Sequence, residues 1–309
     1  MSGFKNNILL VLKGMSMGAA DVVPGVSGGT IALITGVYEE LIHSLKSINL
    51  NSLKLLFNLK LKEFWLSING NFLLLLFGGI LISVFSLARM LKWILEAYPI
   101  LIWSFFLGLI ISSAILVVRS VAKWDWTKIL ALIIGIAAML LITSFTPAVT
   151  SDRYWFIFLA GAIAICAMIL PGISGAFILL ILGKYQFILS AVSNFDIPIL
   201  LVFGLGIIAG LLSFSRFLSF LLKSYRDLTI AVLAGFIIGS VNKIWPWKET
   251  ISTRLNSHGD LVPIIQNNLL PWNYSEATGD KPMLLYAIML IVAGIVVVFL
   301  LESLGKTSK

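Results

Sequence analysis

Long apolar stretches separated by short polar connections follow one another through the whole chain. They span residues 8–20, 30–45, 71–95, 99–118, 127–146, 155–170, 173–189, 197–222, 228–245 and 283–301. A helix needs ~20 residues to cross a hydrocarbon core of ~30 Å, and several stretches reach that length. Apolar and polar residues do not alternate within them, as they would in the strands of a membrane β-barrel. The pattern predicts an all-α polytopic membrane protein, with residues 1–309 forming one integral membrane domain.

Four of the stretches are too short to cross comfortably, and they form two pairs around segments that contain proline and glycine. One pair flanks residues 21–29, which include Pro24 and Gly25. The other flanks residues 170–175, which include Pro171 and Gly172. Because proline and glycine end helices, each pair predicts a helical hairpin that turns back inside the membrane.

The segments around the two turns are copies of one another. Residues 24–28 match 171–175, and residues 36–38 match 183–185 at the same offset. A second block repeats in the same order, with Ser86, Arg89, Tyr98 and Gly108 matched by Ser213, Arg216, Tyr225 and Gly235. Internal repetition therefore divides the domain into two repeats. Repeat 1 covers residues 4–147 with an insert at about 46–66, and repeat 2 covers residues 154–302 with a long loop at about 247–282.

Each repeat is expected to contain a re-entrant hairpin followed by three transmembrane helices. A hairpin returns the chain to the side from which it came, so three net crossings separate the two copies and the second copy is inverted. Inverted repeats are an architecture of secondary transporters, whose substrate site lies at the repeat interface and is formed by broken helices. The repeats thus predict transport by alternating access.

The chain is 59% hydrophobic and 12% charged, whereas ordinary soluble domains are about 25% charged, and its net charge is +8. Placing both termini, the insert and the loops at Arg119 and Lys223 on one side collects most lysines and arginines there. We expect that side to be cytoplasmic and the 247–282 loop to be extracytoplasmic. The positive charge then reflects topology, and no nucleic-acid partner is predicted. The insert either lies on the anionic inner leaflet as an amphipathic helix or is a basic connector without a lipid role.

Metal, redox and enzyme chemistry find no support in the sequence. Cys166 is the single cysteine, and the two histidines, His43 and His258, lie far apart. Neither a disulfide nor a metal or cofactor site is therefore predicted. The chain also lacks a Walker loop, a zinc-protease helix and a serine nucleophile with a paired base, so we do not expect an enzyme.

The two hairpin tips carry the residues best suited to hold an anion. Glycines let the backbone approach a ligand closely, and a helix that begins after the tip points N–H groups toward it. Serine and threonine hydroxyls add further donors. The predicted phosphate-binding residues of the tips are Ser27, Gly28, Gly29, Thr30, Ser174 and Gly175. The alternative is that these small residues only permit tight helix packing.

Arg89 and Arg216 occupy matching positions within two long apolar stretches. An arginine in a membrane segment is costly and tends to face a polar interior, where its guanidinium matches a phosphate bidentately. Each is also far enough along its stretch for the side chain to snorkel to the headgroup region. A phosphate-binding role and a snorkelling role are both open.

Two acidic residues of the first hairpin are candidates for proton coupling. Asp21 lies beside the tip, where a carboxylate can exchange a proton or pair with an arginine, and Met168 takes its place in the second copy. Glu39 closes the second arm of the hairpin and is also compatible with an ordinary interfacial position. Tyr38, its neighbour, is predicted to belong to the aromatic belt at the membrane surface.

The segment Gly18-Ala-Ala-Asp-Val-Val-Pro-Gly-Val-Ser-Gly-Gly-Thr30, together with Leu170-Pro-Gly-Ile-Ser-Gly175, resembles the PopT family of bacterial polyprenyl-phosphate transporters. The resemblance covers nearly the whole chain. It implies a multi-pass protein of the bacterial cytoplasmic membrane that returns undecaprenyl phosphate from the outer to the inner leaflet. This lipid is the carrier of peptidoglycan and other envelope glycans, so its return is a recycling step.

The resemblance also implies paired re-entrant hairpins, as in the DedA-type translocases, with phosphate contacts at the tips. In the second tip Ala176 and Phe177 replace Gly29 and Thr30, so the two tips need not contribute equally. The same tips would also serve a secondary carrier or channel for a small soluble anion, which is the alternative function.

Overall fold

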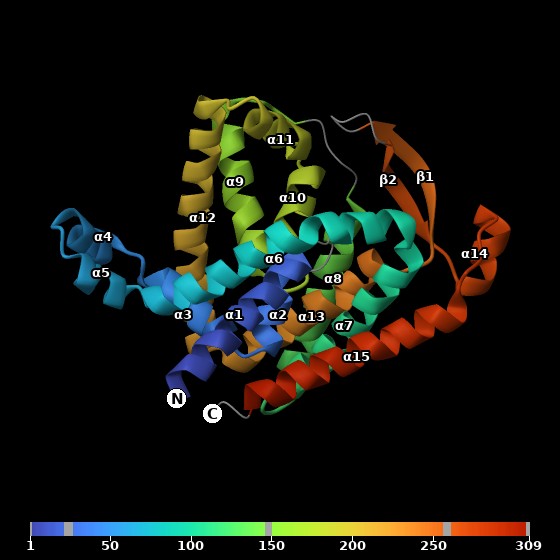
Figure 1. The fold of residues 1–309 in the computed structure, drawn as a ribbon, viewed down its shortest axis with the longest axis horizontal. Helices are drawn as coiled ribbons and strands as arrows, with labels where there is room; N and C mark the ends of the chain where they lie inside the picture. Colours follow the sequence, from blue (N-terminus) through green and yellow to red (C-terminus); the bar gives the residue numbers. More distant parts are fainter. Residues whose placement is uncertain (1, 22–26, 146–149, 256–260, 307–309) are drawn as a thin grey trace.

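The computed structural model describes residues 2–21, 27–145, 150–255 and 261–306 (Figure 1). The first half of the chain forms α1 (Ser2–Asp21), α2 (Gly28–Ile34), α3 (Tyr38–Ser47), α4 (Leu50–Phe57), α5 (Leu61–Ser67), α6 (Gly70–Ala97), α7 (Pro99–Arg119) and α8 (Trp126–Ser144). The second half forms α9 (Tyr154–Ile169), α10 (Gly175–Ile181), α11 (Tyr185–Ser193), α12 (Ile197–Ser224), α13 (Arg226–Ile244), β1 (Lys248–Leu255), β2 (Leu261–Asn268), α14 (Pro271–Thr278) and α15 (Leu284–Lys306).

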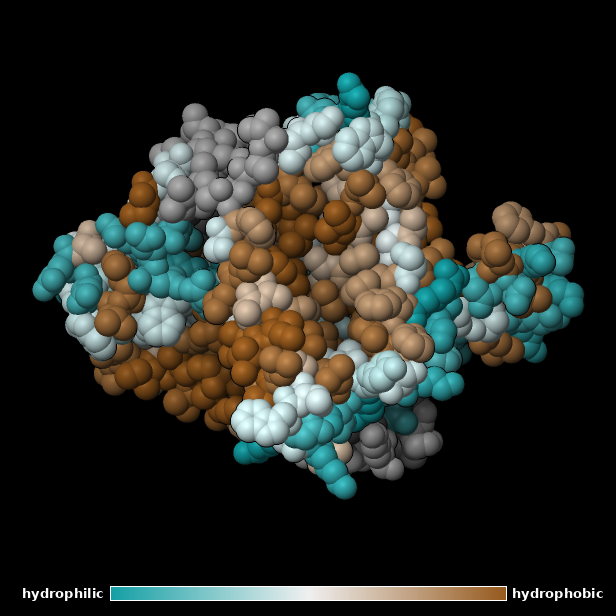
Figure 2. Space-filling model, turned by 180° about the vertical axis from the view of Figure 1, so that it is seen from behind, coloured by the Kyte–Doolittle hydropathy of each residue, from teal (hydrophilic) through white to brown (hydrophobic). Residues whose placement is uncertain are grey.

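Within the described residues, five helices are long and apolar enough to cross a membrane. The five segments are Gly70–Leu87, Pro99–Arg119, Trp126–Ser144, Ile197–Ser224 and Arg226–Ile244, and the bent pair α10 and α11 makes a sixth if it counts as one span. Figure 2 shows a broad apolar surface over the helical body, with hydrophilic residues gathered at its margins. The prediction of a helical multi-pass membrane protein is confirmed.

The described residues are mostly helical and include one region of strand. The long loop after α13 contains an antiparallel pair of strands, β1 and β2, followed by the short helix α14. β1 contains three β-branched residues, Thr250, Ile251 and Thr253, which favour a strand. A strand of eight residues gives a weak signal beside the much longer apolar stretches.

The second arm of each hairpin is broken, which the apolar stretches 30–45 and 173–189 did not predict. In the first hairpin α2 ends and α3 begins around Gly36, which has a φ of 74°. In the second, α10 and α11 meet around Gly183 at an angle of 113°. Both glycines adopt the left-handed backbone conformation that ends helices. With seven residues each, α2 and α10 extend only about 10 Å, a third of the hydrocarbon core.

Each hairpin packs along the long helix that follows it, α1 on α6 and α9 on α12 (Figure 1). The third helix of each repeat instead packs on the opposite repeat, α8 on α13 and α15 on α7. Glycines lie at all four contacts: Gly14 and Gly79 between α1 and α6, Gly161, Gly206 and Gly210 between α9 and α12, Gly135 and Gly235 between α8 and α13, and Gly108 and Gly294 between α7 and α15. A Cβ added at Gly14 would lie 2.2 Å from the carbonyl oxygen of Leu76, so these helices touch backbone to backbone.

The insert predicted at about 46–66 folds as two short helices, α4 and α5, and not as one amphipathic helix. The chain turns between them at Leu59, which has a φ of 58°. Figure 1 shows both helices standing out from the helical body beside α3 and α12. Phe57, Leu59 and Leu61 are largely exposed, as apolar residues that contact lipid would be. The membrane-surface role of the insert stays a prediction.

Candidate functional site

The tips of the two hairpins meet, and we call the contact between residues 27–30 and 169–172 the hairpin junction. The Ser27 hydroxyl donates a hydrogen bond to the carbonyl oxygen of Leu170 at 3.2 Å. In the opposite direction, the backbone N–H of Gly172 donates to the Thr30 hydroxyl at 2.9 Å. Both hydroxyl-bearing residues are buried, with 1% and 0% of their surface exposed. Two of the predicted phosphate-binding side chains thus join one hairpin to the other.

Tyr38 is a junction residue that the sequence did not reveal. Its side chain is 1% exposed, and its hydroxyl donates to the carbonyl oxygen of Ile169 at 3.2 Å. The prediction that Tyr38 lies in an aromatic belt is therefore wrong. A sequence signal for the importance of Tyr38 was the match between residues 36–38 and 183–185, which extends the similarity of the two hairpins beyond their tips.

The beginning of α2 is occupied by a carboxylate of the chain itself. The N–H of Gly28 donates to Asp21 Oδ1 at 2.7 Å, and the N–H of Gly29 donates to the Ser27 hydroxyl, the N-cap of the helix, at 3.1 Å. A Cβ added at Gly28 would lie 2.4 Å from Asp21 Oδ2, so only glycine lets the carboxylate approach. An anionic ligand at this amide would have to displace Asp21.

The second tip is arranged differently. Ser174 is the N-cap of α10, but its hydroxyl makes no hydrogen bond with any described residue. Gly175 is buried, and a Cβ there would lie 2.7 Å from the carbonyl oxygen of Ala164. Gly172, with a φ of 85°, packs against the carbonyl oxygen of Phe236 on α13. The Ser174 hydroxyl is thus available, whereas the hydroxyl of the matching Ser27 is engaged by Leu170 and by the N–H of Gly29.

Arg216 lies at the height of the second tip. Gly206 of α12 packs on Phe158 of α9, and Gly210 packs on Ala162, so the two helices run parallel and in step. Six residues further along each helix, Arg216 is level with Met168, two residues before the turn at Leu170. This position is well inside α12, which continues to Ser224.

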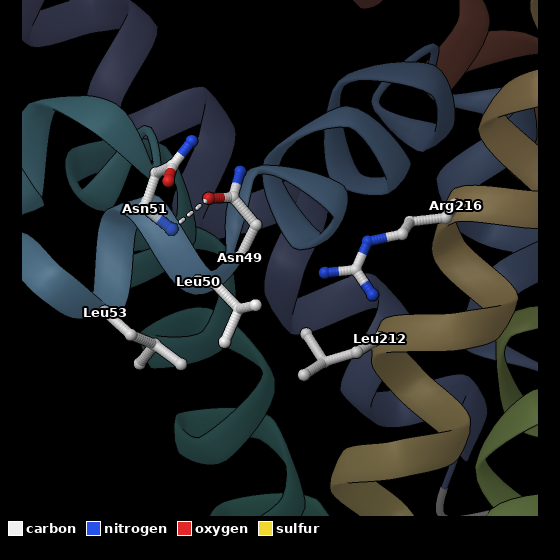
Figure 3. A pocket seen from close by; sticks show the side chains of 6 residues that line it. All are labelled: Asn49, Leu50, Asn51, Leu53, Leu212 and Arg216. Atoms are coloured by element: carbon white, nitrogen blue, oxygen red, sulfur yellow. Dashed lines mark hydrogen bonds between the residues drawn. The ribbon is translucent and has the colours of Figure 1, made fainter.

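The Arg216 side chain points into a cavity of about 490 Å³ between α12 and the start of α4 (Figure 3). The cavity is lined by Asn49, Leu50, Asn51, Leu53, Leu212 and Arg216. Figure 3 shows the guanidinium directed toward Asn49 and Leu50, with Leu212 one turn away on α12. Among the described residues, no carboxylate pairs with this guanidinium. One unpaired cation among leucines and amides suits an amphiphile with an anionic head.

Arg89 occupies the matching place on α6. Ser83 of α6 packs against Gly18 of α1. Asp21 follows Gly18 by three residues and Arg89 follows Ser83 by six, so the backbone of Arg89 lies about one helical turn further along than Asp21. The Arg89 side chain lies outside the described parts of the structure. Its phosphate-binding role stays a prediction.

Glu39 pairs with Arg226, the first residue of α13, at 3.1 Å. Both side chains are about half exposed, so the pair contributes at most about 1 kcal/mol to stability. The carboxylate thus points out of the junction that its neighbour Tyr38 enters. Proton coupling stays a prediction for both acids, and Asp21 is the one that contacts the junction.

No group of three or more metal-ligating side chains occurs among the described residues. His258 lies outside them.

Comparison with known proteins finds a matching family model and two relatives named as polyprenyl-phosphate transporters. Residues 17–262 match the model of the VCA0040-like family, described as undecaprenyl phosphate translocase-like. A polyprenyl-phosphate transporter from Vibrio cholerae is 47% identical over 97% of this chain and 98% of that protein. Another from Staphylococcus aureus is 35% identical over 78% of this chain and 87% of that protein. No solved structure matches. The resemblance noted from the hairpin motifs is confirmed.

Proposed function

This chain belongs to the undecaprenyl phosphate translocase-like family, and on that premise we propose that it carries undecaprenyl phosphate across the bacterial cytoplasmic membrane. Net movement runs from the outer to the inner leaflet, returning the carrier lipid for a new round of envelope glycan synthesis. The protein acts as a transporter by alternating access and not as an enzyme.

The headgroup sets the problem that such a carrier must solve. An isolated phosphate transferred into hydrocarbon would lose hydration worth on the order of tens of kcal/mol, while the polyprenyl tail already lies in lipid. The protein therefore needs a polar path for the head and an opening toward lipid for the tail. The cavity at Arg216 supports this proposal most directly, because it combines an unpaired guanidinium, two asparagines and leucines at the height of a hairpin tip.

Alternating access would open and close the hairpin junction. The junction is held by a few hydrogen bonds between the tips, notably those of Ser27 and Thr30, and not by a continuous helix. Such bonds can exchange for bonds to a phosphate during the cycle. α8 packs on α13 of the other repeat, and α15 packs on α7 of the other repeat. This arrangement supports two inverted halves that rock against one another around the junction.

Asp21 gives the cycle a place for proton coupling. As long as its carboxylate accepts from the N–H of Gly28, a phosphate and the carboxylate compete for the same donor. Protonation of Asp21 removes the competing negative charge. A proton taken up from outside would thereby favour phosphate binding at the first tip.

The loop charges support a cytoplasmic location for both termini and an extracytoplasmic location for β1, β2 and α14. Arg216, in the cytoplasmic half of α12, would then meet the headgroup late in the inward passage, and Arg89 would meet it early.

Proteoliposomes test the function. Undecaprenyl phosphate is supplied in the outer leaflet, and a phosphatase that cannot cross the membrane counts the headgroups that remain there. The proposal expects protein-dependent loss of accessible headgroups, and a loss no faster than in protein-free vesicles contradicts it. The alternative carrier of a small anion would instead take up labelled inorganic phosphate, and added lipid phosphate would not compete.

A further inference from the structure

Two lysines lie together at the end of α13 that leads into the β-strands, away from Arg216 and from the junction hydrogen bonds. Lys243 belongs to the last turn of α13, and Lys248 is the first residue of β1. The Lys248 ammonium donates to the carbonyl oxygen of Lys243, so the chain folds back and brings the two residues together. Both side chains are partly buried.

Each ammonium faces an aromatic ring. The Nζ of Lys243 lies 4.8 Å from the ring centre of Phe177 on α10, and that of Lys248 lies 5.3 Å from the ring centre of Trp103 on α7. Neither forms an ion pair with a described carboxylate. Burial, and secondly the charge of Lys243, lower the pKa of Lys248 to about 7.

A purely structural role accounts for only part of this arrangement. Lysines at the end of a helix offset its dipole, which is equivalent to about half a negative charge. Two ammonium groups supply up to four times that charge in a partly buried place. An anion between them would compensate the excess and accept the donors that remain.

The surroundings hold the lysines in place. Trp245 and Trp247 pack edge to face, and their indole N–H groups donate to the carbonyl oxygens of Leu269 and Pro282. These bonds fix the turn between α13 and β1 that carries Lys248. A site whose donors are held before the ligand arrives loses less entropy when it binds.

Helix α13 relates the pair to the hairpin junction. Lys243 follows Phe236 by seven residues, so both lie on the same face of α13, about 10 Å apart along the helix axis. The carbonyl oxygen of Phe236 packs on Gly172 of the second tip. Phe177, whose ring faces Lys243, lies two residues after Gly175 of the same tip. Phe177 in the second copy thus matches Thr30 in the first.

The first repeat has no such pair. The offset that relates Arg89 to Arg216 places Leu116 and Val121 at the matching positions. The lysine pair is therefore not part of the repeated pattern, and an asymmetric carrier needs such a difference between its two halves.

We propose that Lys243 and Lys248 form a phosphate-binding site that receives the lipid headgroup at the extracytoplasmic face before it moves to the hairpin junction. The assignment to a lipid headgroup rests on the proposed function; the phosphate chemistry of the pair does not.

Binding to the purified full-length protein tests the site. The probes are farnesyl phosphate, farnesol and inorganic phosphate, and the variants are Lys243→Gln and Lys248→Gln. The matched control is Lys281→Gln, an exposed lysine of the same loop. We expect each of the two site variants to weaken farnesyl phosphate binding at least about tenfold, since each removes a charge-assisted hydrogen bond. The control should bind like the wild type, and farnesol binding should be the same in all four proteins.

Several outcomes decide the proposal. Farnesyl phosphate binding within twofold of the wild type in both site variants overturns it, even if the wild type translocates undecaprenyl phosphate. Lysine-dependent binding of inorganic phosphate alone, without competition by farnesyl phosphate, keeps the anion site and overturns its assignment to the lipid. If Lys248→Gln fails to fold because it loses the bond to the Lys243 carbonyl, Lys243→Gln carries the test, and Lys248→Arg should restore binding.

Discussion

The hydrogen bond between Thr30 and Gly172 offers a sharp test of the hairpin junction. Replacing Thr30 with valine keeps the shape of the side chain and removes the hydroxyl that accepts the Gly172 N–H at 2.9 Å. Thr30 is fully buried, so water cannot take the place of the hydroxyl without rearrangement. The substitution leaves a buried donor unsatisfied.

The expected loss follows from the partners of each hydroxyl. An unsatisfied buried N–H costs about 1–3 kcal/mol. Thr35 gives a matched control, because its buried hydroxyl donates to the carbonyl oxygen of Ile31, which also accepts the N–H of Thr35. Thr35→Val thus removes a redundant bond within one hairpin and should cost only about 0.5 kcal/mol.

Thermal unfolding in detergent, followed by tryptophan fluorescence, measures the difference. With roughly 2–4 °C per kcal/mol, Thr30→Val should lower the melting temperature by several degrees and Thr35→Val by about 1–2 °C. If Thr30 also contacts phosphate, Thr30→Val alone should slow translocation in proteoliposomes. Equal melting temperatures for the two variants would refute the argument that Thr30 joins the two hairpins.

Three further predictions concern packing, the headgroup and the proton. Gly210→Ala should destabilise the protein because its Cβ would lie 2.5 Å from the carbonyl oxygen of Ala162, whereas Gly204→Ala, with open space around it, should be neutral or slightly stabilising in the same melting assay. Arg216→Ala should lower translocation of undecaprenyl phosphate more than tenfold with normal expression, while Lys223→Ala near the end of the same helix should leave it unchanged. A wild-type rate in the Arg216→Ala variant would make Arg216 a snorkelling anchor. Asp21→Asn should flatten the pH dependence of translocation, because an amide cannot exchange the coupled proton, and an unchanged pH profile rules that role out.

The sequence predicted the features that depend on local chemistry. Proline and glycine between short apolar stretches predicted the hairpins, and the length of the remaining six stretches predicted five helices long enough to span; the stretch 283–301 falls short of that length among the described residues. The repeat directed attention to Arg216 before its surroundings were known. Each of these signals lies within a few consecutive residues or within one periodic pattern.

Features that depend on tertiary contacts were out of reach. The hydropathy of residues 30–45 is continuous across Gly36, so nothing in it reported the break between α2 and α3. The burial of Tyr38 depends on where the other hairpin lies. The cavity at Arg216 depends on α4, which belongs to an insert that the second repeat lacks.

The tip residues illustrate the same limit. Their small size and hydroxyl groups favoured both anion binding and tight packing. In this conformation Ser27 and Thr30 bond to the second tip and the N–H of Gly28 bonds to Asp21, while Ser174 stays available. Both interpretations describe the same residues at different stages of the proposed cycle.

The most direct test of the account is an experimental structure of the wild-type protein with undecaprenyl phosphate in a lipid bilayer. We expect density for the phosphate at the hairpin junction or between the junction and either Arg216 or the lysine pair, with the polyprenyl tail leaving sideways into lipid. Phosphate density that lies away from all of these residues, around an unchanged junction, would contradict it.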